Sequence, residues 1–417
     1  MKRFGGNRTP PGPAPRSNVL GTSSFRYRDF RFLWVSTFLN AIAMMGEHLV
    51  LGWLVLELSG SPFMVGVAFG LRMAPLFFLG IPAGAIADKV DRRHLIKLTN
   101  LAMAATTAGL GVLILLGVAE LWHILVFTFV AGSLRALYQT ARLTFAYDIV
   151  GPAGAVNGLA LVTLGMWVGG LVGSLATGSL VARLGADIAY IALAGGYALA
   201  AVTLLPVRPQ RRATPQTRNP VLQNLKEYLV EVRGNSALAM LVAFTSAVEI
   251  LGWSYQVLLP SLARDVLKVG AEGLGVMNAF RSVGGIVGII VLSAIGEVRR
   301  KGLLFLSVVF FFGGFVVLLA FVSNFYLALA VLVLINSMAV VSDILSQSMM
   351  QLMVPDALRG RAMGSWVLAV GTGPVGHLQI GAIASAIGTT FALTTNGAGL
   401  VVLSLIATVF SSRLRRL

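Results

Sequence analysis

The sequence predicts an all-α membrane protein in which twelve transmembrane helices form two six-helix bundles and both termini lie in the cytoplasm. Three observations lead to this fold class. The 417 residues are 57% hydrophobic and only 12% charged, about half the charged fraction of soluble domains. Apolar runs of about 20 residues, the length that spans a bilayer, recur along the whole chain. Most of the 32 Lys and Arg residues lie in alternate connections between those runs.

The predicted elements begin after a polar N-terminal segment. Residues 1–24 are rich in Pro, Gly and Arg and have no apolar core, which excludes a cleaved signal peptide and predicts a disordered basic cytoplasmic tail. One long polar connection, 207–236, is the predicted cytoplasmic linker between an N-terminal bundle at 25–206 and a C-terminal bundle at 237–412, and a basic cytoplasmic tail follows at 413–417. The predicted spans are 31–56, 63–86, 96–117, 122–147, 156–181, 187–206, 237–260, 273–296, 303–322, 326–352, 362–387 and 389–411.

The placement of the basic residues predicts the orientation in the membrane. With the N-terminus inside, only three of the 32 basic residues fall in outer loops, and four more fall within spans. The others lie on the cytoplasmic side, as the positive-inside rule requires. The three outer residues are Arg183, Arg264 and Lys268, and the four intramembrane ones are Arg72, Arg135, Arg142 and Arg281.

Composition and motif content argue against several function classes. The net charge of +16 sits in short loops and not on a nucleic-acid-binding stretch. The chain has no cysteine and its four histidines are scattered, so we expect no metal site. It contains no GxxxxGK[ST] motif and no evident nucleophile–base set, so we expect neither direct use of ATP nor an enzyme. The expected partners are a small-molecule substrate, protons and the lipid bilayer, with no cofactor and a monomeric state.

The two halves contain an internal repeat. Aligning Gly66 with Gly275 superimposes the second and eighth predicted spans, and Arg72 then falls on Arg281. Each of these spans ends in an acid that two adjacent bases follow within a few residues. Two six-helix halves related by duplication are a known transporter architecture, with the substrate near the midplane between them. The two aligned acids are Asp88 and Glu297.

The connection between the second and third spans carries a motif, GAIADKVDRR. It resembles the G-x-x-x-D-[RK]-x-G-R-[RK] motif that major facilitator superfamily transporters have at this place. The departure is Asp91, which replaces the second glycine of the motif. Because aspartate tolerates left-handed backbone, we expect the same turn there. The matching positions are Gly84, Asp88, Lys89, Arg92 and Arg93.

A second block, VPDALRGRAMG at 354–364, is similar to the connection between helices ten and eleven in the drug:proton antiporter-3 group of that superfamily. With WLVLELSGSPFMVG at 53–66, it extends the resemblance over nearly the whole chain. The group contains macrolide exporters and siderophore exporters of the enterobactin type. The resemblance implies the major facilitator fold, alternating access and proton-coupled export.

Acids and bases are predicted near the bilayer midplane of both halves. At about 1.5 Å per residue, Glu47 and Arg72 lie roughly 15 Å deep in the first two spans, and Glu249 and Arg281 do so in the seventh and eighth. Ionisable groups inside a span are functional candidates, so we assign these residues to proton coupling, with Glu47 first and Glu249 second. The alternative is a static buried ion pair. Proton-coupled members of the superfamily often carry an arginine in the fourth helix, and the resemblance points to Arg135.

The repeat also predicts a gate at the cytoplasmic side. Asp88 is expected to lie against the positive N-terminal end of the eleventh span. By the internal repeat, Glu297 is expected to lie against the start of the fifth span. Two such contacts would hold the bundles together on the cytoplasmic side and favour the outward-open state. The alternative is that Asp88 only anchors its loop. The predicted gate comprises Gly84, Asp88, Lys89, Arg92, Arg93, Glu297 and Arg361.

Polar residues and glycines within the spans complete the candidate set. Asp343 and Gln347 share one face of the tenth span, where they either line a cavity or satisfy a neighbouring helix. Glycines at every fourth position of the fifth span and a Gly-x-Gly-Pro pattern in the eleventh predict close packing or hinges. The substrate-cavity candidates are Trp53, Trp167, Tyr255, Gln256, Asp343, Gln347, Trp366 and Gln379. The packing or hinge candidates are Gly165, Gly169, Gly173, Gly371, Gly373 and Pro374.

The sequence therefore predicts a multi-pass transporter of the cell inner membrane that exports an amphipathic small molecule, a drug or a siderophore, in exchange for protons. Two alternatives stay open. One is a lipid-handling facilitator that moves lysophospholipid without proton coupling, and the other is a facilitator-like sensor that transports nothing. Glu47→Gln would abolish proton exchange but spare lipid movement, and loss of the first 24 residues would disable only the sensor.

Overall fold

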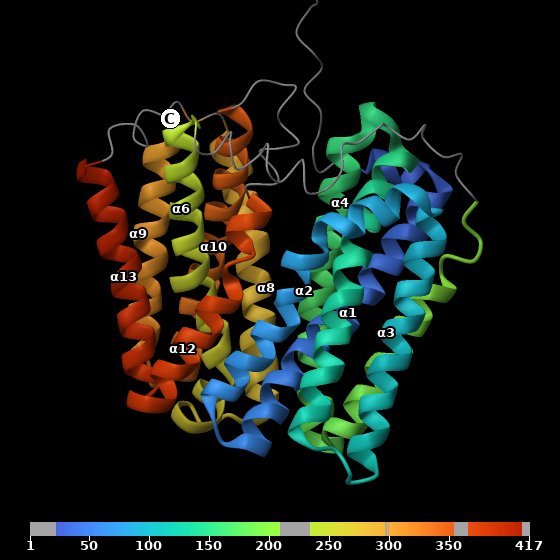
Figure 1. Cartoon of the computed structure of the whole chain (residues 1–417), viewed down its shortest axis with the longest axis horizontal. Coiled ribbons are helices and arrows are strands. Elements are labelled where there is room, and N and C mark those ends of the chain that lie inside the picture. Colours follow the sequence, from blue (N-terminus) through green and yellow to red (C-terminus); the bar gives the residue numbers. More distant parts are fainter. Residues whose placement is uncertain (1–21, 209–233, 297, 299, 354–365, 411–417) are drawn as a thin grey trace, which may run out of the picture.

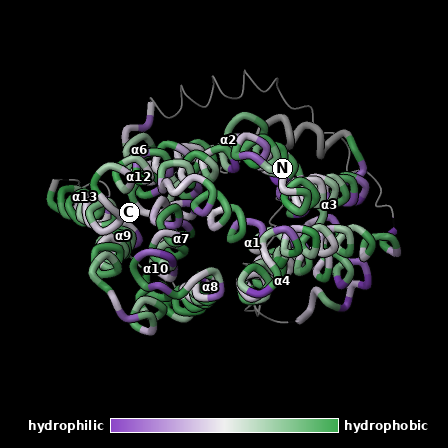
Figure 2. The backbone as a smooth tube through the Cα atoms, turned by 90° about the horizontal axis from the view of Figure 1, so that it is seen from below, coloured by the Kyte–Doolittle hydropathy of each residue, from purple (hydrophilic) through white to green (hydrophobic). Residues whose placement is uncertain are grey.

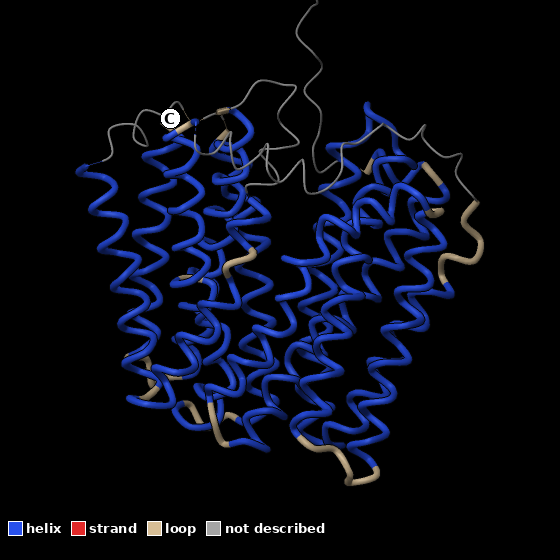
Figure 3. The backbone as a smooth tube through the Cα atoms, viewed as in Figure 1, coloured by secondary structure: helices blue, strands red, loops and turns tan. Residues whose placement is uncertain are grey.

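The computed structural model describes residues 22–208, 234–296, 298, 300–353 and 366–410, and of residues 80–89, 153 and 410 only the backbone. Every regular element in this part of the chain is a helix, and none is a strand (Figure 3). The helices stand side by side in two groups that follow the order of the sequence (Figure 1). The prediction of an all-α protein is confirmed.

The N-terminal group begins with a short 3₁₀ turn, η1, at Ser23–Arg26. Asn157 fixes this turn to α4 by accepting hydrogen bonds from Ser23 and Ser24. Within the group, α4 packs along the other three helices. The helices are α1 (Arg28–Ser59), α2 (Pro62–Lys89), α3 (Arg92–Leu115) and α4 (Leu121–Val202).

The long helix α4 folds back on itself at two glycines. Gly151 and Gly185 have φ angles of 69° and 91°, a region that residues with side chains rarely adopt. Contacts with α1 show the reversal at Gly185. A Cβ added at Gly46 on α1 would meet both Thr177, at 2.2 Å, and Leu193, at 2.5 Å. Those two residues would be about 24 Å apart on a straight helix. We therefore describe α4 as a first, a second and a third segment, separated by Gly151 and Gly185.

The C-terminal group contains the remaining helices. Its first long helix is followed by three short helical turns, and the others are regular. The elements are α6 (Ser236–Leu251), η2 (Trp253–Leu258), α7 (Leu259–Ser261), η3 (Leu262–Val266), α8 (Gly270–Ile295), α9 (Lys301–Ala320), α10 (Phe325–Leu352), α12 (Gly373–Ile387) and α13 (Thr389–Phe410).

The predicted span 237–260 is not one continuous α-helix. The α-helix stops at Leu251, and the 3₁₀ turn η2 follows Gly252. Two residues account for the change. Gly252 lies so close to Phe312 that a Cβ would come within 2.6 Å of its ring. Pro260 has no N–H to donate to the carbonyl of Gln256, and the N–H of Leu259 bonds that carbonyl instead.

Eleven helical stretches in the described residues are long and apolar enough to cross a membrane. They coincide with the predicted spans, except that the fifth and sixth fall within one 49-residue stretch, Gly154–Val202, which contains the reversal at Gly185. Hydrophobic residues make up most of the helices in both groups (Figure 2), and the exposed ones include Leu98, Leu116 and Phe321. Apolar surface of this extent is that of a multi-pass membrane protein.

The two ends of the molecule are named here by their connections. The Gly60 end carries the turns at Gly60, Gly117, Gly185 and Gly388, and lies at the bottom of Figure 1. The linker end is the opposite one, where α6 begins and where η1 docks on α4. Helices therefore alternate in direction between these two ends.

The turn between α2 and α3 differs from the expected one. Asp91 has φ −58° and ψ 117°, so its backbone is not left-handed. Its carboxylate accepts hydrogen bonds from the backbone N–H groups of Arg93, at 2.9 Å, and His94, at 3.4 Å. The expectation of a left-handed residue was wrong because the acid caps the free N–H groups at the start of α3, which a glycine cannot do.

Asp91→Ala is expected to lower the free energy of unfolding by about 1 kcal/mol, the usual worth of such a cap. Asp91→Asn is the matched control, because its amide oxygen can still accept both bonds. Thermal unfolding of the three proteins in the same detergent measures the effect. Equal stability of the Ala and Asn variants would contradict the capping role.

Candidate functional site

The predicted midplane residues of the N-terminal group form a buried ion pair. Arg72 Nη1 on α2 donates to Glu47 Oε1 on α1 at 2.9 Å, and the hydroxyl of Tyr197 donates to Glu47 Oε2 at 2.6 Å. Glu47 is 7% exposed and Arg72 is 5% exposed. Both carboxylate oxygens are therefore satisfied, as a charge buried at this depth requires.

Close packing of the backbone holds Arg72 in place. Its Nη2 donates to the carbonyl of Met44 at 3.2 Å. Its own carbonyl lies against Gly132 in the first segment of α4, where a Cβ would come within 2.3 Å. The two helices can approach this closely because residue 132 has no side chain. Arg135 lies on the next turn of α4 and is partly exposed.

The equivalent arginine of the C-terminal group has neutral partners. Arg281 on α8 donates from Nε to the hydroxyl of Tyr255 at 2.9 Å and from Nη1 to Asn278 Oδ1 at 2.7 Å. Its guanidinium also lies over the ring of Tyr255, 5.4 Å from the centroid. The two halves therefore differ, because the turn η2 presents Tyr255 to the arginine where the N-terminal group presents Glu47.

Glu249 lies buried on α6 beside the start of another helix. Its Oε2 is 4.0 Å from where a Cβ of Gly373, the first residue of α12, would lie. The hydroxyl of Thr372 donates to the carbonyl of Ser246 on α6 at 3.4 Å, which ties the two helices together there. Among the described residues, no Lys or Arg forms a salt bridge with Glu249. The carboxylate thus lies at the positive end of α12, and no cation of the described residues pairs with it.

Three of the cavity candidates meet around Asp343. Its Oδ1 accepts a hydrogen bond from the indole of Trp366 at 2.6 Å, and its Oδ2 accepts one from the amide of Gln347 at 3.1 Å. All three side chains are partly exposed. They form a polar cluster on α10 and on the helical turn that precedes α12.

The other cavity candidates are spread over several contacts. Trp167 lies against Gly285 on α8, and Trp53 packs on the hydrophobic core. Tyr255 is fully buried under Arg281. The amide of Gln379 donates to Asn396 on α13 at 2.9 Å, so this residue pairs within its own helix group.

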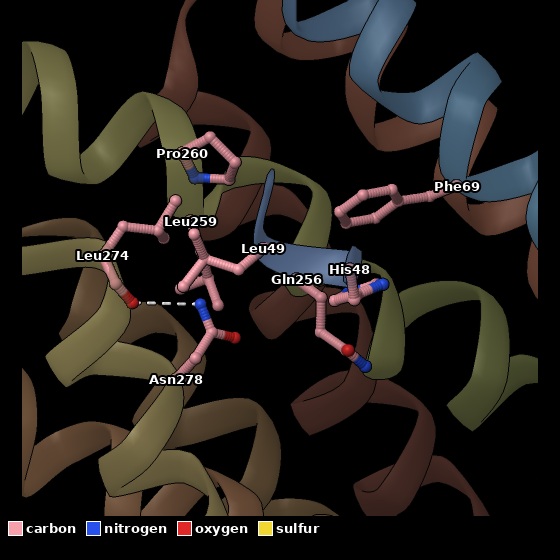
Figure 4. A pocket seen from close by; sticks show the side chains of 8 residues that line it. All are labelled: His48, Leu49, Phe69, Gln256, Leu259, Pro260, Leu274 and Asn278. Carbon is pink, nitrogen blue, oxygen red and sulfur yellow. Dashed lines mark hydrogen bonds between the residues drawn. The ribbon is translucent and has the colours of Figure 1, made fainter. Parts of the chain in front are cut away.

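A small cavity lies between the two helix groups and includes the last candidate, Gln256 (Figure 4). Its volume is about 10 Å³, room for about one water molecule. The ring of His48 stacks on that of Phe69 at 4.2 Å along one side. Of the described residues, no three His, Asp or Glu side chains form a group that could hold a metal ion. The cavity is lined by His48, Leu49, Phe69, Gln256, Leu259, Pro260, Leu274 and Asn278.

Among the described residues, two seams join the helix groups, and each contains one of the two glycines that the repeat aligns. In the first seam Gly66 on α2 crosses α12, where a Cβ would come 2.3 Å from the carbonyl oxygen of His377. In the second, Gly275 on α8 crosses the second segment of α4, where its Cβ would lie 2.8 Å from the Cα of Gly178. The aligned glycines therefore have the same role in packing.

Both seams run from the Gly60 end towards the middle of the molecule. Phe77, in the last contact of the first seam, lies about 22 Å along α2 from its start. The first seam contains the pairs Ser61–Ser385, Gly66–His377, Gly70–Pro374, Met73–Gly373 and Phe77–Gly371, and the second contains Arg183–Glu272, Ser179–Glu272, Gly178–Gly275, Gly170–Ser282 and Trp167–Gly285.

The glycine candidates serve two different contacts. The three glycine candidates on the second segment of α4 all lie against α1: Gly165, Gly169 and Gly173. The closest is Gly173, where an added Cβ would lie 2.3 Å from the carbonyl oxygen of Ile42. In the C-terminal group residues 366–370 are helical, the helix is interrupted at Gly371 and Thr372, and α12 begins at Gly373 with a proline in its first turn. The break at 371–374 faces α2 across the first seam.

The predicted gate lies only partly within the described residues. Arg92 forms a salt bridge with Asp148 near the end of the first segment of α4. Arg93 Nη2 donates to the carbonyl of Leu205 at 3.0 Å. Both bonds tie the α2–α3 turn to the N-terminal group. The side chains of Asp88 and Lys89 and the residues Glu297 and Arg361 lie outside the described part, and Gly84 is described only by its backbone.

Several residues that matter for the site did not stand out in the sequence. Tyr197, which holds Glu47, and Asn278, which holds Arg281, are such cases. So is the Asn40–Asn100 amide pair between α1 and α3, joined at 2.7 Å. Each is a polar side chain inside a predicted span, and that placement is the signal that could have found them.

Comparison with known families and curated proteins gives consistent matches. The family model described as transmembrane secretion effector matches residues 20–416. The enterobactin exporter EntS of Shigella boydii serotype 18 is 25% identical over 399 residues, which cover 93% of this chain and 92% of that protein. The exporter of the same name from Escherichia coli O139:H28 matches with the same identity and coverage.

Solved structures of low sequence identity share the fold. The nucleoside transporter NupG, at 13% identity, has a TM-score of 0.79 over 92% of this chain and all of its own. A bacterial homologue of the human lysosomal transporter Spinster, in an inward-facing and occupied conformation, has a TM-score of 0.73 at 16% identity and covers 95% of this chain and 99% of its own. Likeness at these identities concerns the fold alone.

Proposed function

The chain belongs to the transmembrane secretion effector family of the major facilitator superfamily, and on that premise we propose that it exports an amphipathic small molecule in exchange for protons. It is a multi-pass protein of the cell inner membrane. In the proposal, the N-terminal and C-terminal helix groups are two six-helix domains, and the reversal within Gly154–Val202 makes twelve crossings in all.

The observation that carries this proposal is the position of the two seams. In the part of the chain that the structure describes, the cross-group contacts of both seams lie between the Gly60 end and the middle of the molecule. Opening of these seams, and closing of the linker end in their place, would expose one central site to each side of the membrane in turn. The predicted gate of Gly84, Asp88, Lys89, Arg92, Arg93, Glu297 and Arg361 would act in the second of these states.

The charge distribution supports a cytoplasmic position for the linker end. The turn with Arg92 and Arg93, the docked segment with Arg26 and Arg28, and the start of α9 at Lys301 all lie there. Basic residues concentrate on the cytoplasmic side of inner-membrane proteins. On this basis both termini are cytoplasmic, and the conformation is closed towards the outside.

Among the candidates for proton coupling, we favour Glu249. Both oxygens of Glu47 are held, by Arg72 and by Tyr197, so a change in its protonation would have to break a buried pair. Glu249 has no salt bridge in the described part of the chain and lies beside the break that precedes α12. Loss of its charge would weaken its attraction to the start of α12, and the Gly371–Pro374 break packs on α2 of the other domain.

The similarity to an enterobactin exporter supports a siderophore as a candidate substrate. The cluster of Asp343, Gln347 and Trp366 supplies both polar and aromatic contacts on the C-terminal domain. In the proposed cycle, the substrate reaches this cluster from the cytoplasm and leaves after the seams at the Gly60 end have opened.

The seams provide the test of alternating access. A side chain in Gly178→Val would come within 2.7 Å of the Gly275 backbone, and overpacking of this kind costs about 1–3 kcal/mol. We expect the closed seam to be destabilised, so that Leu274→Cys in this cysteine-free chain is labelled about tenfold faster by a membrane-impermeant thiol reagent from the Gly60 side.

Gly195→Val is the matched control, because a Cβ at Gly195 would meet no atom within 4 Å. It should leave the labelling rate of Leu274→Cys at the native value. Equal labelling in the Gly178→Val and Gly195→Val backgrounds would show that the seam does not control access, and the proposed mechanism would fail.

A further inference from the structure

Between the two seams, α1 meets the C-terminal group around the small cavity of Figure 4. The cavity has walls from both groups, because Phe69 lies on α2 of the first seam and Leu274 lies on α8 of the second. Beside it, a Cβ at Gly52 on α1 would come 2.9 Å from Pro260 on α7. The cavity therefore belongs to the interface between the groups and not to the interior of either one.

Most of the cavity wall is apolar and buried. The four largest apolar side chains of the lining are between 1% and 3% exposed: Leu49, Phe69, Leu259 and Leu274. An apolar wall offers no hydrogen bond to what it encloses. The polar side chains of the lining therefore decide what binds there.

In the described part of the chain, two polar side chains that line the cavity form no hydrogen bond. They are His48 on α1 and Gln256 on η2, one from each helix group. The ring of His48 is fixed by its stacking on Phe69, with 4.2 Å between the ring centroids. A neutral imidazole has one donor and one acceptor, and an amide has both kinds. One small polar molecule can therefore bond to both side chains.

Asn278 is a third polar group of the lining, and two of its bonds are already made. Its Nδ2 donates to the carbonyl of Leu274 at 3.0 Å, and its Oδ1 accepts from Arg281 at 2.7 Å. The guanidinium of Arg281 beside the cavity disfavours a cation there. The volume of about 10 Å³ is that of about one water molecule, and cavities with two to four polar partners are those that hold ordered water.

We propose that one water molecule binds in this cavity and bridges His48 of the N-terminal group to Gln256 of the C-terminal group. The two side chains separate when the seams open, so the bridge stabilises the conformation that is closed at the Gly60 end. The inference goes beyond the proposed export function, because a water at this interface depends neither on the substrate nor on proton coupling.

The first test is X-ray hydroxyl-radical labelling of the full-length protein in nanodiscs, read by mass spectrometry. Mixing with heavy-oxygen water just before the pulse separates a bound water, which still delivers the light isotope, from bulk water. We expect light-isotope labelling of Phe69 and Leu274 in the native protein. In Gln256→Leu it should fall about tenfold, the scale of one lost hydrogen bond. Phe312, which is fully buried and does not line the cavity, should stay unlabelled.

Gln139→Leu is the matched control for this measurement. Gln139 lies on the first segment of α4, forms no hydrogen bond in the described residues and does not line the cavity. This variant should be labelled as the native protein is. Absence of light-isotope labelling at Phe69 and Leu274, or equal labelling in the two glutamine variants, would overturn the proposal.

The second test measures whether the bridge holds the groups together. Ala271→Cys reports opening, because Ala271 is 5% exposed and its carbonyl oxygen would lie 3.0 Å from a Cβ of Gly178 across the second seam. A membrane-impermeant thiol reagent added from the Gly60 side should label this cysteine about tenfold faster in Gln256→Leu and in His48→Phe, which keeps the stacked ring.

The double variant His48→Phe with Gln256→Leu should be labelled no faster than either single variant, because one substitution already removes the bridge. Unchanged labelling in the single variants, or effects that add in the double variant, would show that the two side chains do not share a water. Either result would overturn the proposal whatever the protein transports.

Discussion

Glu249→Gln is expected to abolish proton-driven accumulation while the protein stays folded. Glutamine has nearly the same shape as glutamate but cannot release a proton. In inside-out vesicles with an acidic lumen, one-for-one exchange can build an accumulation ratio of about ten per pH unit, since one unit is worth about 1.4 kcal/mol. The variant should show a ratio close to one, measured by the uptake of the dye fluorescein, and should still equilibrate the dye down its own gradient.

Glu57→Gln is the control for this experiment, because Glu57 is an exposed acid on the last turn of α1. It should accumulate the dye as the native protein does. Full accumulation by Glu249→Gln would show that another group carries the proton. Loss of accumulation in Glu47→Gln, with Glu249→Gln active, would restore the order of candidates that the sequence suggested.

Arg72→Leu is expected to cause the largest loss of stability. It leaves the buried carboxylate of Glu47 with only the Tyr197 hydroxyl and removes the bond to the Met44 carbonyl. Breaking one partner of a buried ion pair typically costs about 3–5 kcal/mol. Thermal unfolding followed by tryptophan fluorescence, together with the fraction of monodisperse protein after heating, measures the effect.

The double variant Glu47→Gln with Arg72→Leu tests whether the loss of stability comes from the unpaired charge of Glu47. Replacing both charges removes the unpaired acid, so most of the lost stability should return. Arg26→Leu, an exposed residue, should unfold as the native protein does. A double variant as unstable as Arg72→Leu would mean that the arginine acts by packing and not by neutralising Glu47.

The architecture was predictable because it follows from hydrophobic length, turn residues and the repeat. The repeat aligns Gly66 with Gly275, and the structure places both glycines where helices of opposite groups touch. At such positions a side chain would collide with the facing backbone, so the glycines in the sequence indicate close helix packing. The break at 371–374 was likewise signalled by its glycines and proline.

Local departures from regular helix were harder to predict. The span at 237–260 is largely apolar, and its length is that of a simple transmembrane helix. The end of α6 at Leu251 depends on the ring of Phe312 against Gly252, a contact between residues 60 positions apart that no local pattern reveals. The capping role of Asp91 could not be predicted from the family motif, because the glycine at that position of the motif has no side chain that could cap the helix.

At the candidate site, the sequence located the charges but not their partners. Glu47 and Arg72 were placed at one depth, and they do form a pair. Equal depth for Glu249 and Arg281 did not make a second pair, because depth says nothing about which way a side chain points around its helix. Tyr255, the actual partner of Arg281, was predicted only as a cavity residue.

Uptake by inside-out vesicles that contain the native protein tests the central claim most directly. With an acidic lumen, we predict that fluorescein accumulates in the lumen, that a protonophore abolishes the accumulation, and that vesicles without the protein show none. Dye that equilibrates at the same rate and to the same level with and without the pH gradient would contradict the claim that this chain is a proton-driven exporter.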